Sequence, residues 1–305
     1  MAVSGVLEGR GDKARKPPAT LERAQVRAVS PYRLRRWLGR LGLYLSVIFL
    51  VSPAVLFFFW MISLSLKNEI DNTAYPPVFI PNPPTFVNFI KVFAENDFLS
   101  YTLNSVIVSF SATGLALLLG VPAGYGIAKS KAVKAAVLIL IARVTPGLSY
   151  LIPLFLVFQW MHLLGGYSPQ IITHLVLTIP IVVWVMIGTF EALPPDLEEA
   201  ALVDGCNIWQ AFRHVAVPLA KPGIMVGMIL AFIFSWNNFI FGVVLAGRST
   251  RTLPVAVYNM LTFEQISWGP LAAAALVVTA PVLFLTLLMQ KEIVAGLTAG
   301  GVKGG

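Results

Sequence analysis

The sequence predicts an all-α integral membrane protein with six transmembrane helices. Of its 305 residues, 57% are hydrophobic and only 12% are charged, whereas a soluble domain carries about 25% charged residues. The apolar residues lie in runs of about 20, the length that crosses the hydrocarbon core of a bilayer. These runs must be helical, because a chain in lipid has to satisfy its own backbone hydrogen bonds and nothing here alternates like a barrel strand.

The predicted spans form one membrane domain over residues 41–291. A basic segment, 1–40, precedes it, and a glycine-rich tail, 292–305, follows it. We expect the basic segment to be flexible and assign it no role. Because the first apolar run begins only near Leu41, it is interpreted as an uncleaved span rather than a signal peptide. The six spans are expected at about 41–66, 103–128, 135–160, 171–190, 224–246 and 271–290.

The distribution of Lys and Arg predicts that both termini are cytoplasmic. In that orientation 17 basic residues lie on the cytoplasmic side and 4 on the opposite side, as the positive-inside rule requires. The net charge of +8 therefore reflects membrane topology, and we expect a lipid environment and no nucleic acid partner. The outside segments are then 67–102, 161–170 and 247–270, and the last of these is long enough to suggest a function.

Motifs of several functional classes are missing from the sequence. It contains no G-x-x-x-x-G-K-[ST] phosphate-binding loop and no H-E-x-x-H zinc motif. The single cysteine, Cys206, excludes an intrachain disulfide and a cysteine metal cluster. We therefore expect no catalytic residue, metal site or cofactor in this chain. The spans also lack Asp and Glu, which weakens the hypothesis of an ion-coupled secondary carrier.

Several predicted spans contain polar or helix-breaking residues. Ser235, Asn237 and Asn238 lie deep in the fifth span, where they either form interhelical hydrogen bonds or line a polar translocation path. Arg143, in the third span, either reaches the lipid headgroups or makes an ion pair at a gate or helix interface. Proline kinks are expected at Pro146, Pro153 and Pro180, and close helix packing at Gly114, Gly120, Gly124 and Gly126.

The loop 191–223, between the fourth and fifth spans, predicts a short docked helix. Asp196 is placed to cap it, with Glu199 at the spacing of a capping box. Gly205 is placed to end it in left-handed geometry. The resulting helix, Leu197–Asp204, would be about 12 Å long. A helix this short is only marginally stable alone in water, so it must dock on another surface.

The surface of this helix favours a protein partner over lipid. Ala200 and Ala201 would let a partner's backbone approach closely, and an acidic rim is unsuited to anionic lipid. That rim consists of Glu198, Glu199 and Asp204. A second helix is predicted from about Asn207, carrying Ile208, Trp209, Phe212 and Val215 on one side.

At these residues the sequence resembles the EAA motif of binding-protein-dependent ABC importer permeases. The match is Glu199-Ala200-Ala201, then Gly205, then Val215-Ala216-Val217-Pro218, with valines in place of Ile and Leu. The stretches "WNNF" at 236–239 and "GLTAGGVKG" at 296–304 are similar to the carbohydrate-type, MalG-like subunits. The resemblance covers nearly all of the chain beyond residue 41. It implies a type I importer permease bundle in the bacterial inner membrane.

The resemblance also implies a transporter of several proteins. These are a second permease subunit, an ATPase homodimer that binds ATP and Mg, and a periplasmic or lipid-anchored binding protein. The EAA helix would be the coupling helix on the ATPase, with contributions from Glu198, Glu199, Ala200, Ala201, Asp204, Gly205, Val215 and Pro218. The long third outside loop would contact the binding protein through Arg248, Arg251 and Tyr258.

The resemblance makes a sugar or related polyol the expected cargo. The alternatives are another small solute such as a glycerol phosphate, a self-sufficient secondary carrier, or a membrane scaffold whose loop recruits a cytoplasmic protein.

Overall fold

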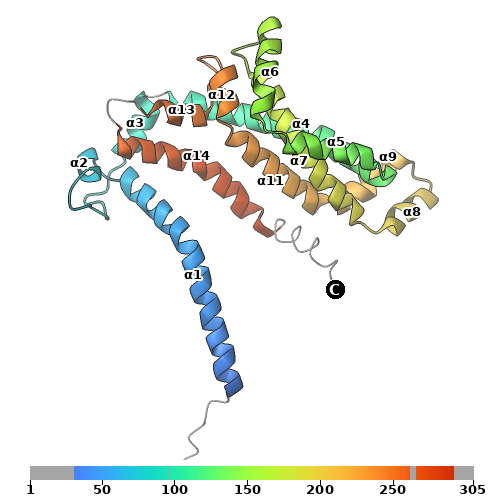
Figure 1. Cartoon of the computed structure of the whole chain (residues 1–305), viewed down its shortest axis with the longest axis horizontal. Coiled ribbons are helices and arrows are strands. Elements are labelled where there is room, and N and C mark those ends of the chain that lie inside the picture. The colour runs from blue at the N-terminus through green and yellow to red at the C-terminus, as the bar shows by residue number, and fades with distance from the viewer. Residues whose placement is uncertain (1–30, 96, 262–265, 292–305) are drawn as a thin grey trace, which may run out of the picture. The chain divides into compact units, whose positions relative to one another are not determined.

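The computed structural model describes residues 31–95, 97–261 and 266–291. These residues are mostly helical, and they contain no β-strand, only an isolated bridge between Gly165 and Ala246. The predicted all-α fold class is therefore confirmed (Figure 1). The N-terminal segment up to residue 30 and the C-terminal tail from residue 292 lie outside the described residues.

The chain divides into two compact units, Met1–Leu56 and Phe57–Gly305. In the first unit the described residues belong to α1 (Pro31–Ser65), which begins about ten residues before the predicted span. Nearly all side chains of this part of α1 from Arg36 onward are exposed, although the helix is strongly apolar. An exposed apolar surface of this size is typical of contact with lipid or another protein.

The second unit begins with the last turns of α1. Its other elements are α2 (Glu69–Asn72), α3 (Val87–Glu95), α4 (Phe98–Ser130), α5 (Val133–Val144), α6 (Leu148–Trp160), α7 (Tyr167–Glu191), α8 (Pro195–Val203), α9 (Ile208–Ala211), the π-helix η1 (Phe212–Ala216), α10 (Val217–Leu219), α11 (Lys221–Trp236), α12 (Ile240–Leu245), α13 (Leu253–Asn259) and α14 (Trp268–Leu288).

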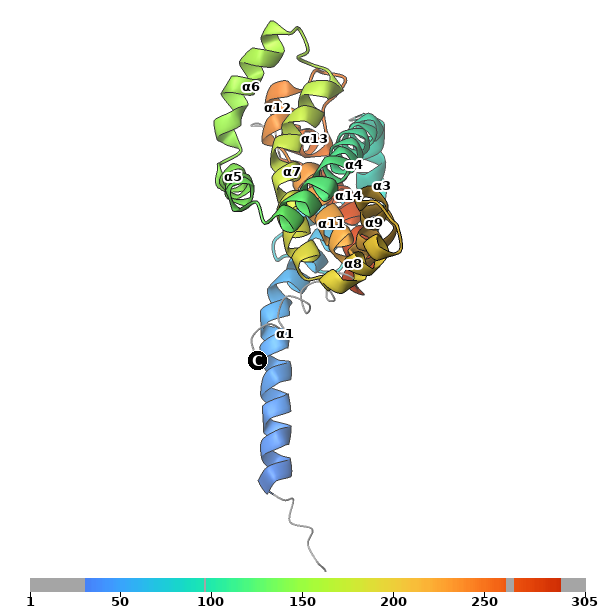
Figure 2. The ribbon, with the colours of Figure 1, turned by 90° about the vertical axis from the view of Figure 1, so that its right-hand side faces the viewer.

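Four described helices are long and apolar enough to span a membrane: Arg36–Ser65, α4, α7 and α14. Two further pairs meet the same test together. These are α5 with α6, bent by 90°, and Ile208–Leu219 with α11, bent by 76°. If each bent pair is one span, the total is six, the predicted number. Figure 2 shows the first bend, with α5 seen end-on and α6 upright.

The third predicted span is divided at residues 145–147, which is a sharper break than the predicted kink. Thr145 has an extended backbone, with φ −62° and ψ 125°. The cause is Pro146, because a proline ring disfavours helical backbone at the residue before it. Pro153 and Pro180, by contrast, lie inside continuous helices.

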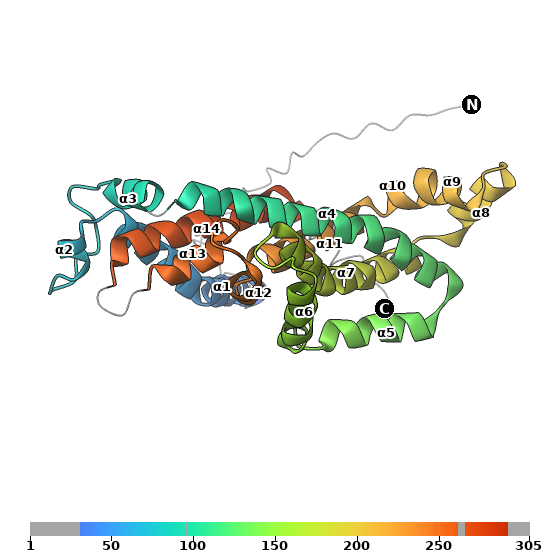
Figure 3. The same cartoon turned by 90° about the horizontal axis from the view of Figure 1, so that it is seen from above.

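Helices α4, α7 and α11 pack together at the centre of the second unit, as Figure 3 shows for α4 and α7. Gly120 and Gly124 allow α4 to approach α7 closely. A Cβ on Gly120 would lie 2.7 Å from Cγ1 of Val182, and one on Gly124 would overlap α7 as well. The predicted glycine packing is thus confirmed at these two positions. It is wrong at Gly114 and Gly126, because a Cβ built on either glycine would have no atom of another element within 4 Å.

Buried Lys67 holds the proline-rich segment 74–86 in place. Its ammonium donates a hydrogen bond to the carbonyl oxygen of Val78 (2.6 Å) and lies 4.6 Å from the centroid of the Trp60 ring. Burial lowers the pKa of Lys67, and the Asp71 carboxylate opposes this shift. The segment contains no helix or strand, as its prolines predict.

Candidate coupling site

The short helix predicted in loop 191–223 is present as α8, beyond the end of α7 (Figure 1). Pro195 occupies its first position, where the fixed φ of proline fits a helix and its missing N–H is not needed. Asp196 therefore lies inside the first turn and makes no capping bond, so the predicted capping box with Glu199 is wrong. Its carboxylate still stabilises α8 through the helix dipole.

The predicted left-handed end of α8 is confirmed. Gly205 has φ +91°, and a Cβ built on it would have no neighbour within 4 Å. Glycine is therefore favoured here by the backbone angle and not by close packing. The Cys206 N–H donates to the Ala201 carbonyl (3.0 Å), and the Gly205 N–H donates to the Leu202 carbonyl (3.1 Å). This pair of bonds is a Schellman motif, which satisfies the last carbonyls of α8 and turns the chain sharply.

A capping box is present one helix later than predicted. The Asn207 side chain accepts a hydrogen bond from the Gln210 N–H, and the Gln210 side chain accepts one from the Asn207 N–H, both at 2.8 Å. The helix α9 predicted from this point is followed directly by η1, which contains half-buried Val215. Exposed Pro218 lies in α10. The hairpin from Pro195 to Ala211 is hereafter called the α8–α9 hairpin.

The hairpin exposes most of the residues that the EAA resemblance assigns to the ATPase contact. Those exposed are Glu199, Ala200, Asp204 and Gly205, while Ala201 is half-buried. Apolar side chains stand beside them in solvent: Val203 is 88% exposed, Ile208 71% and Trp209 62%. Exposed apolar groups on a short polar hairpin are typical of a protein-docking surface.

Glu198 differs from the rest of the predicted acidic rim, because it is buried against its own chain. Only 6% of it is exposed. Its Oε1 lies 2.9 Å from Nζ of Lys129, and its Oε2 accepts a hydrogen bond from the Tyr125 hydroxyl at 2.8 Å. The expectation that Glu198 belongs to the exposed rim is therefore wrong. Both of its partners come from the last turns of α4, and sequence reasoning assigned neither of them a role.

An aromatic cluster forms around Tyr125, whose hydroxyl binds Glu198. The Tyr125 ring lies 5.2 Å from the Phe190 ring of α7 and 4.7 Å from the Phe212 ring of η1, between centroids. Phe212 in turn lies 5.1 Å from Trp209. Phe212 is buried while Trp209 is exposed, so the two residues predicted on one side of the second helix are divided between the core and the exposed surface of the hairpin.

The polar residues of the fifth predicted span have three different surroundings. Buried Ser235 lies 2.7 Å from Nδ1 of His174 and so joins α11 to α7. Asn238 accepts a hydrogen bond from the Phe241 N–H (3.1 Å) in the first turn of α12, whose start at Ile240 divides the predicted span 224–246. Of the three, Asn237 is thus the one with an exposed side chain, and its amide donates a hydrogen bond to the Ile233 carbonyl of α11 (3.0 Å).

The segment 247–252, which carries Arg248 and Arg251, is fixed to α4 and α7 by side-chain hydrogen bonds. Asn104 donates to the carbonyl oxygens of Ser249 (2.9 Å) and Arg251 (2.8 Å), and it accepts from the Tyr167 hydroxyl (2.6 Å). This segment is hereafter called the arginine loop.

Further bonds complete the attachment of the arginine loop. Gln170 donates to the Thr250 carbonyl (3.1 Å), and the Thr250 hydroxyl donates to the Gly165 carbonyl (2.7 Å). The Ser105 hydroxyl accepts from the Leu253 N–H (2.7 Å), just after the loop. The guanidinium groups are not part of this attachment: Arg248 is exposed, Arg251 is half-buried, and within the described residues neither forms an ion pair.

Tyr258 of α13 is 55% exposed and packs against Phe239, with 4.9 Å between ring centroids. The sequence predicted Tyr258 and the two arginines as one contact region, and all three are open to solvent at least in part.

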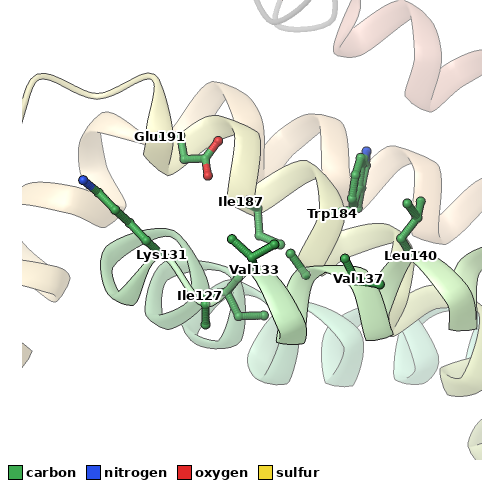
Figure 4. Close-up of a pocket in the computed structure, with 10 residues that line it drawn as sticks. Ile127, Lys131, Val133, Val137, Leu140, Trp184, Ile187 and Glu191 are labelled. Atoms are coloured by element: carbon green, nitrogen blue, oxygen red, sulfur yellow. The ribbon is translucent and has the colours of Figure 1, made fainter.

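A pocket of about 220 Å³ lies between α4, α5 and α7, and its wall is apolar except for Lys131 and Glu191. Figure 4 shows the residues that line it. Near it, the Arg143 guanidinium lies 6.0 Å from the centroid of Trp184. Within the described residues Arg143 forms no ion pair, and its helix contact is with this aromatic ring. A second cavity, between the end of α1 and α14, is also mostly apolar. Neither cavity has the several converging polar groups that orient a polar ligand.

The family described as "Binding-protein-dependent transport system inner membrane component" matches residues 116–296 of the chain. The chain belongs to this family. The matched region contains the α8–α9 hairpin and the arginine loop. The protein is accordingly a permease component of the bacterial inner membrane, as the EAA resemblance implied.

Two relatives illustrate the similarity over most of the chain. One is the sulfoquinovosyl glycerol transport system permease protein SmoH of Agrobacterium fabrum, 34% identical over 80% of this chain and 87% of that protein. The other is the trehalose transport system permease protein SugB of Mycobacterium tuberculosis, 35% identical over 83% of this chain and 94% of that protein.

The fold is also found in solved structures. A chain in the crystal structure of a bacterial ABC transporter that imports the acidic polysaccharide alginate superimposes with a TM-score of 0.70. The superposition covers 85% of this chain and 97% of the other, at 22% sequence identity. At that identity the similarity supports the ABC importer permease fold and nothing finer.

Proposed function

We propose that this chain is one permease subunit of an ATP-driven importer that moves a sugar or related polyol across the inner membrane. The α8–α9 hairpin carries the proposal, because it presents exposed EAA residues and exposed apolar side chains. Its helices are too short to be stable alone in water, so they need a surface to dock on. A separate ATPase homodimer, which binds ATP and Mg, is the partner that this surface would take.

The proposed cargo is supported by the two relatives, whose names specify trehalose and sulfoquinovosyl glycerol. The apolar walls of the two cavities give a further argument about where the cargo passes. Since a sugar needs converging polar groups, its path is better placed between this chain and a second permease subunit, with Asn237 among the residues that face it.

A binding protein, periplasmic or lipid-anchored, would deliver the cargo at the arginine loop and Tyr258. Their side chains are open while the loop backbone is held by α4 and α7, so the loop presents two positive charges in a fixed arrangement. Such an arrangement suits a partner with an acidic surface, and the contact would weaken with salt.

In the proposed cycle, ATP-driven closure of the ATPases displaces the α8–α9 hairpin and rocks the helical bundle from inward-facing to outward-facing. Glu199 would orient the docked helix, Ala200 and Ala201 would fit the partner's cleft, and Gly205 would permit the turn. The ATPase can shift the bundle between these two arrangements only if it binds them with different free energies, so its contact with the hairpin must differ between them.

Purification of the tagged, full-length chain from its native membrane tests the proposal. We expect an ATPase and a second permease to co-purify, and uptake by the reconstituted complex to require ATP. Uptake by this chain alone without ATP would establish a secondary carrier instead. Co-purification of a cytoplasmic protein without any ATPase would establish a scaffold.

A further inference from the structure

We propose that α4 connects the ATPase-docking hairpin to the arginine loop, and that Glu198 is the positioning residue that ties the hairpin to α4. This inference rests on the proposed function, since it concerns how displacement of the hairpin reaches the opposite end of the bundle. It is carried by one observation: the same helix binds the α8–α9 hairpin near its last turn and the arginine loop near its first turns.

The attachment near the last turn of α4 is the buried carboxylate of Glu198. Lys129 and Tyr125 both reach it, and the Lys129 ammonium also lies 5.9 Å from the centroid of the Tyr125 ring. Breaking this contact would leave a charge in a partly desolvated place without its partner, which is unfavourable. The end of α4 should therefore follow the hairpin when the hairpin moves.

The attachment near the first turns of α4 is made by Asn104 and Ser105. Asn104 binds two carbonyl oxygens of the arginine loop, and Ser105 binds the N–H of Leu253 directly after it. Both side chains are buried. A shift of α4 along or about its axis would therefore carry the backbone of the arginine loop with it.

Between the two attachments α4 is one helix of 33 residues, about 50 Å long at 1.5 Å per residue. Pro122 lies inside it without ending it. Figure 3 shows α4 running from the side of α3 and α13 toward the side of α8. The close contacts of Gly120 and Gly124 with α7 favour movement of α4 and α7 together over bending of α4 alone.

The test follows the arginine loop while the ATPase is trapped. It uses the reconstituted transporter with its co-purified ATPase, and Ser249→Cys in a Cys206→Ser chain, which then carries one thiol. The rate at which a membrane-impermeant maleimide labels this chain is measured without nucleotide and with Mg-ATP plus vanadate. We expect trapping to change the rate at least about fivefold, the lower end of typical coupling between sites.

Variants of the ion pair then decide whether the change travels through Glu198. In Glu198→Gln and in Lys129→Met we expect trapping to change the rate less than about twofold. Reversing the pair, with Glu198→Lys and Lys129→Glu together, should restore the response. Tyr125→Phe keeps the ring and removes one hydrogen bond, so it should give an intermediate response. Exposed Lys131 supplies the matched control, and Lys131→Met should respond as the parent does.

Each other outcome contradicts the inference in a distinguishable way. A full response in both Glu198→Gln and Lys129→Met, with the ATPase bound, shows that the pair transmits nothing. Loss of the ATPase in every pair variant but not in Lys131→Met shows that the pair is needed for docking rather than transmission. No response in the parent chain with an active ATPase overturns the inference alone. Absence of any ATPase from the purified parent overturns the proposed function itself.

Discussion

The arginine loop and the α8–α9 hairpin both offer exposed side chains to a partner, yet they are held in opposite ways. In the arginine loop, side chains of α4 and α7 bind the loop's backbone carbonyls, so its path is fixed residue by residue. In the hairpin, the backbone bonds are mostly local, and the polar contact with α4 is made by one residue, Glu198. The first is suited to a template that keeps its shape relative to α4 and α7, and the second to a part that moves as one piece.

Asn104→Leu should detach the arginine loop from α4 and have the largest effect on stability. The substitution leaves two loop carbonyls and the Tyr167 hydroxyl without their partner. At about 1 kcal/mol for each of the three hydrogen bonds lost, we expect a loss of roughly 3 kcal/mol. Thermal unfolding of the purified transporter measures it. Exposed Asn237→Leu is the comparison, and equal unfolding temperatures for the two variants would contradict the fixed-template description.

Gly205→Val should disable the hairpin without unfolding the rest of the chain. Valine at φ +91° costs about 1–2 kcal/mol, which should reopen the turn after α8. We expect uptake to fall about tenfold, since 1.4 kcal/mol corresponds to that factor, with membrane insertion unchanged. Gly205→Asn is the matched control, because asparagine tolerates left-handed geometry. Equal uptake by the valine variant and the parent would show that the turn at Gly205 in the α8–α9 hairpin is not needed for transport.

Asn238→Leu and Asn237→Leu should have the smallest effects on stability, and they distinguish a structural asparagine from one that acts in transport. Asn238 accepts a hydrogen bond from the Phe241 N–H, so its loss should cost about 1 kcal/mol and lower the unfolding temperature slightly. Asn237 is exposed, so its replacement should leave the unfolding temperature unchanged and reduce uptake. If Asn237→Leu transports at the parent rate, Asn237 does not line the path.

Hydropathy was sufficient to predict the helical class, because each span depends on its own local composition. The ends of α8 show how far local rules extend. The glycine rule correctly placed the left-handed turn at Gly205. The capping rule failed at Asp196 because Pro195, a competing helix-start residue, stands directly before it.

The surroundings of Glu198 could not be predicted from local patterns. A glutamate followed by another glutamate on a short loop helix suggests two solvated charges, and Glu199 fits that expectation. The burial of Glu198 depends on Lys129, which comes from a distant turn and reaches it only in the folded chain. Ser235 and His174 are likewise paired across two helices, which no spacing in the sequence indicates.

The break after α5 has a consequence for the surroundings of the bundle. With 12 and 13 residues, α5 and α6 are each about 18–20 Å long, shorter than a hydrocarbon core of about 30 Å. If the two form one bent span, the non-helical peptide groups at 145–147 lie at membrane depth. Such groups are tolerated only where protein or water covers them. In that arrangement acyl chains must be excluded from this corner, which makes it a place where the assembled transporter is either hydrated or sealed by a neighbouring subunit.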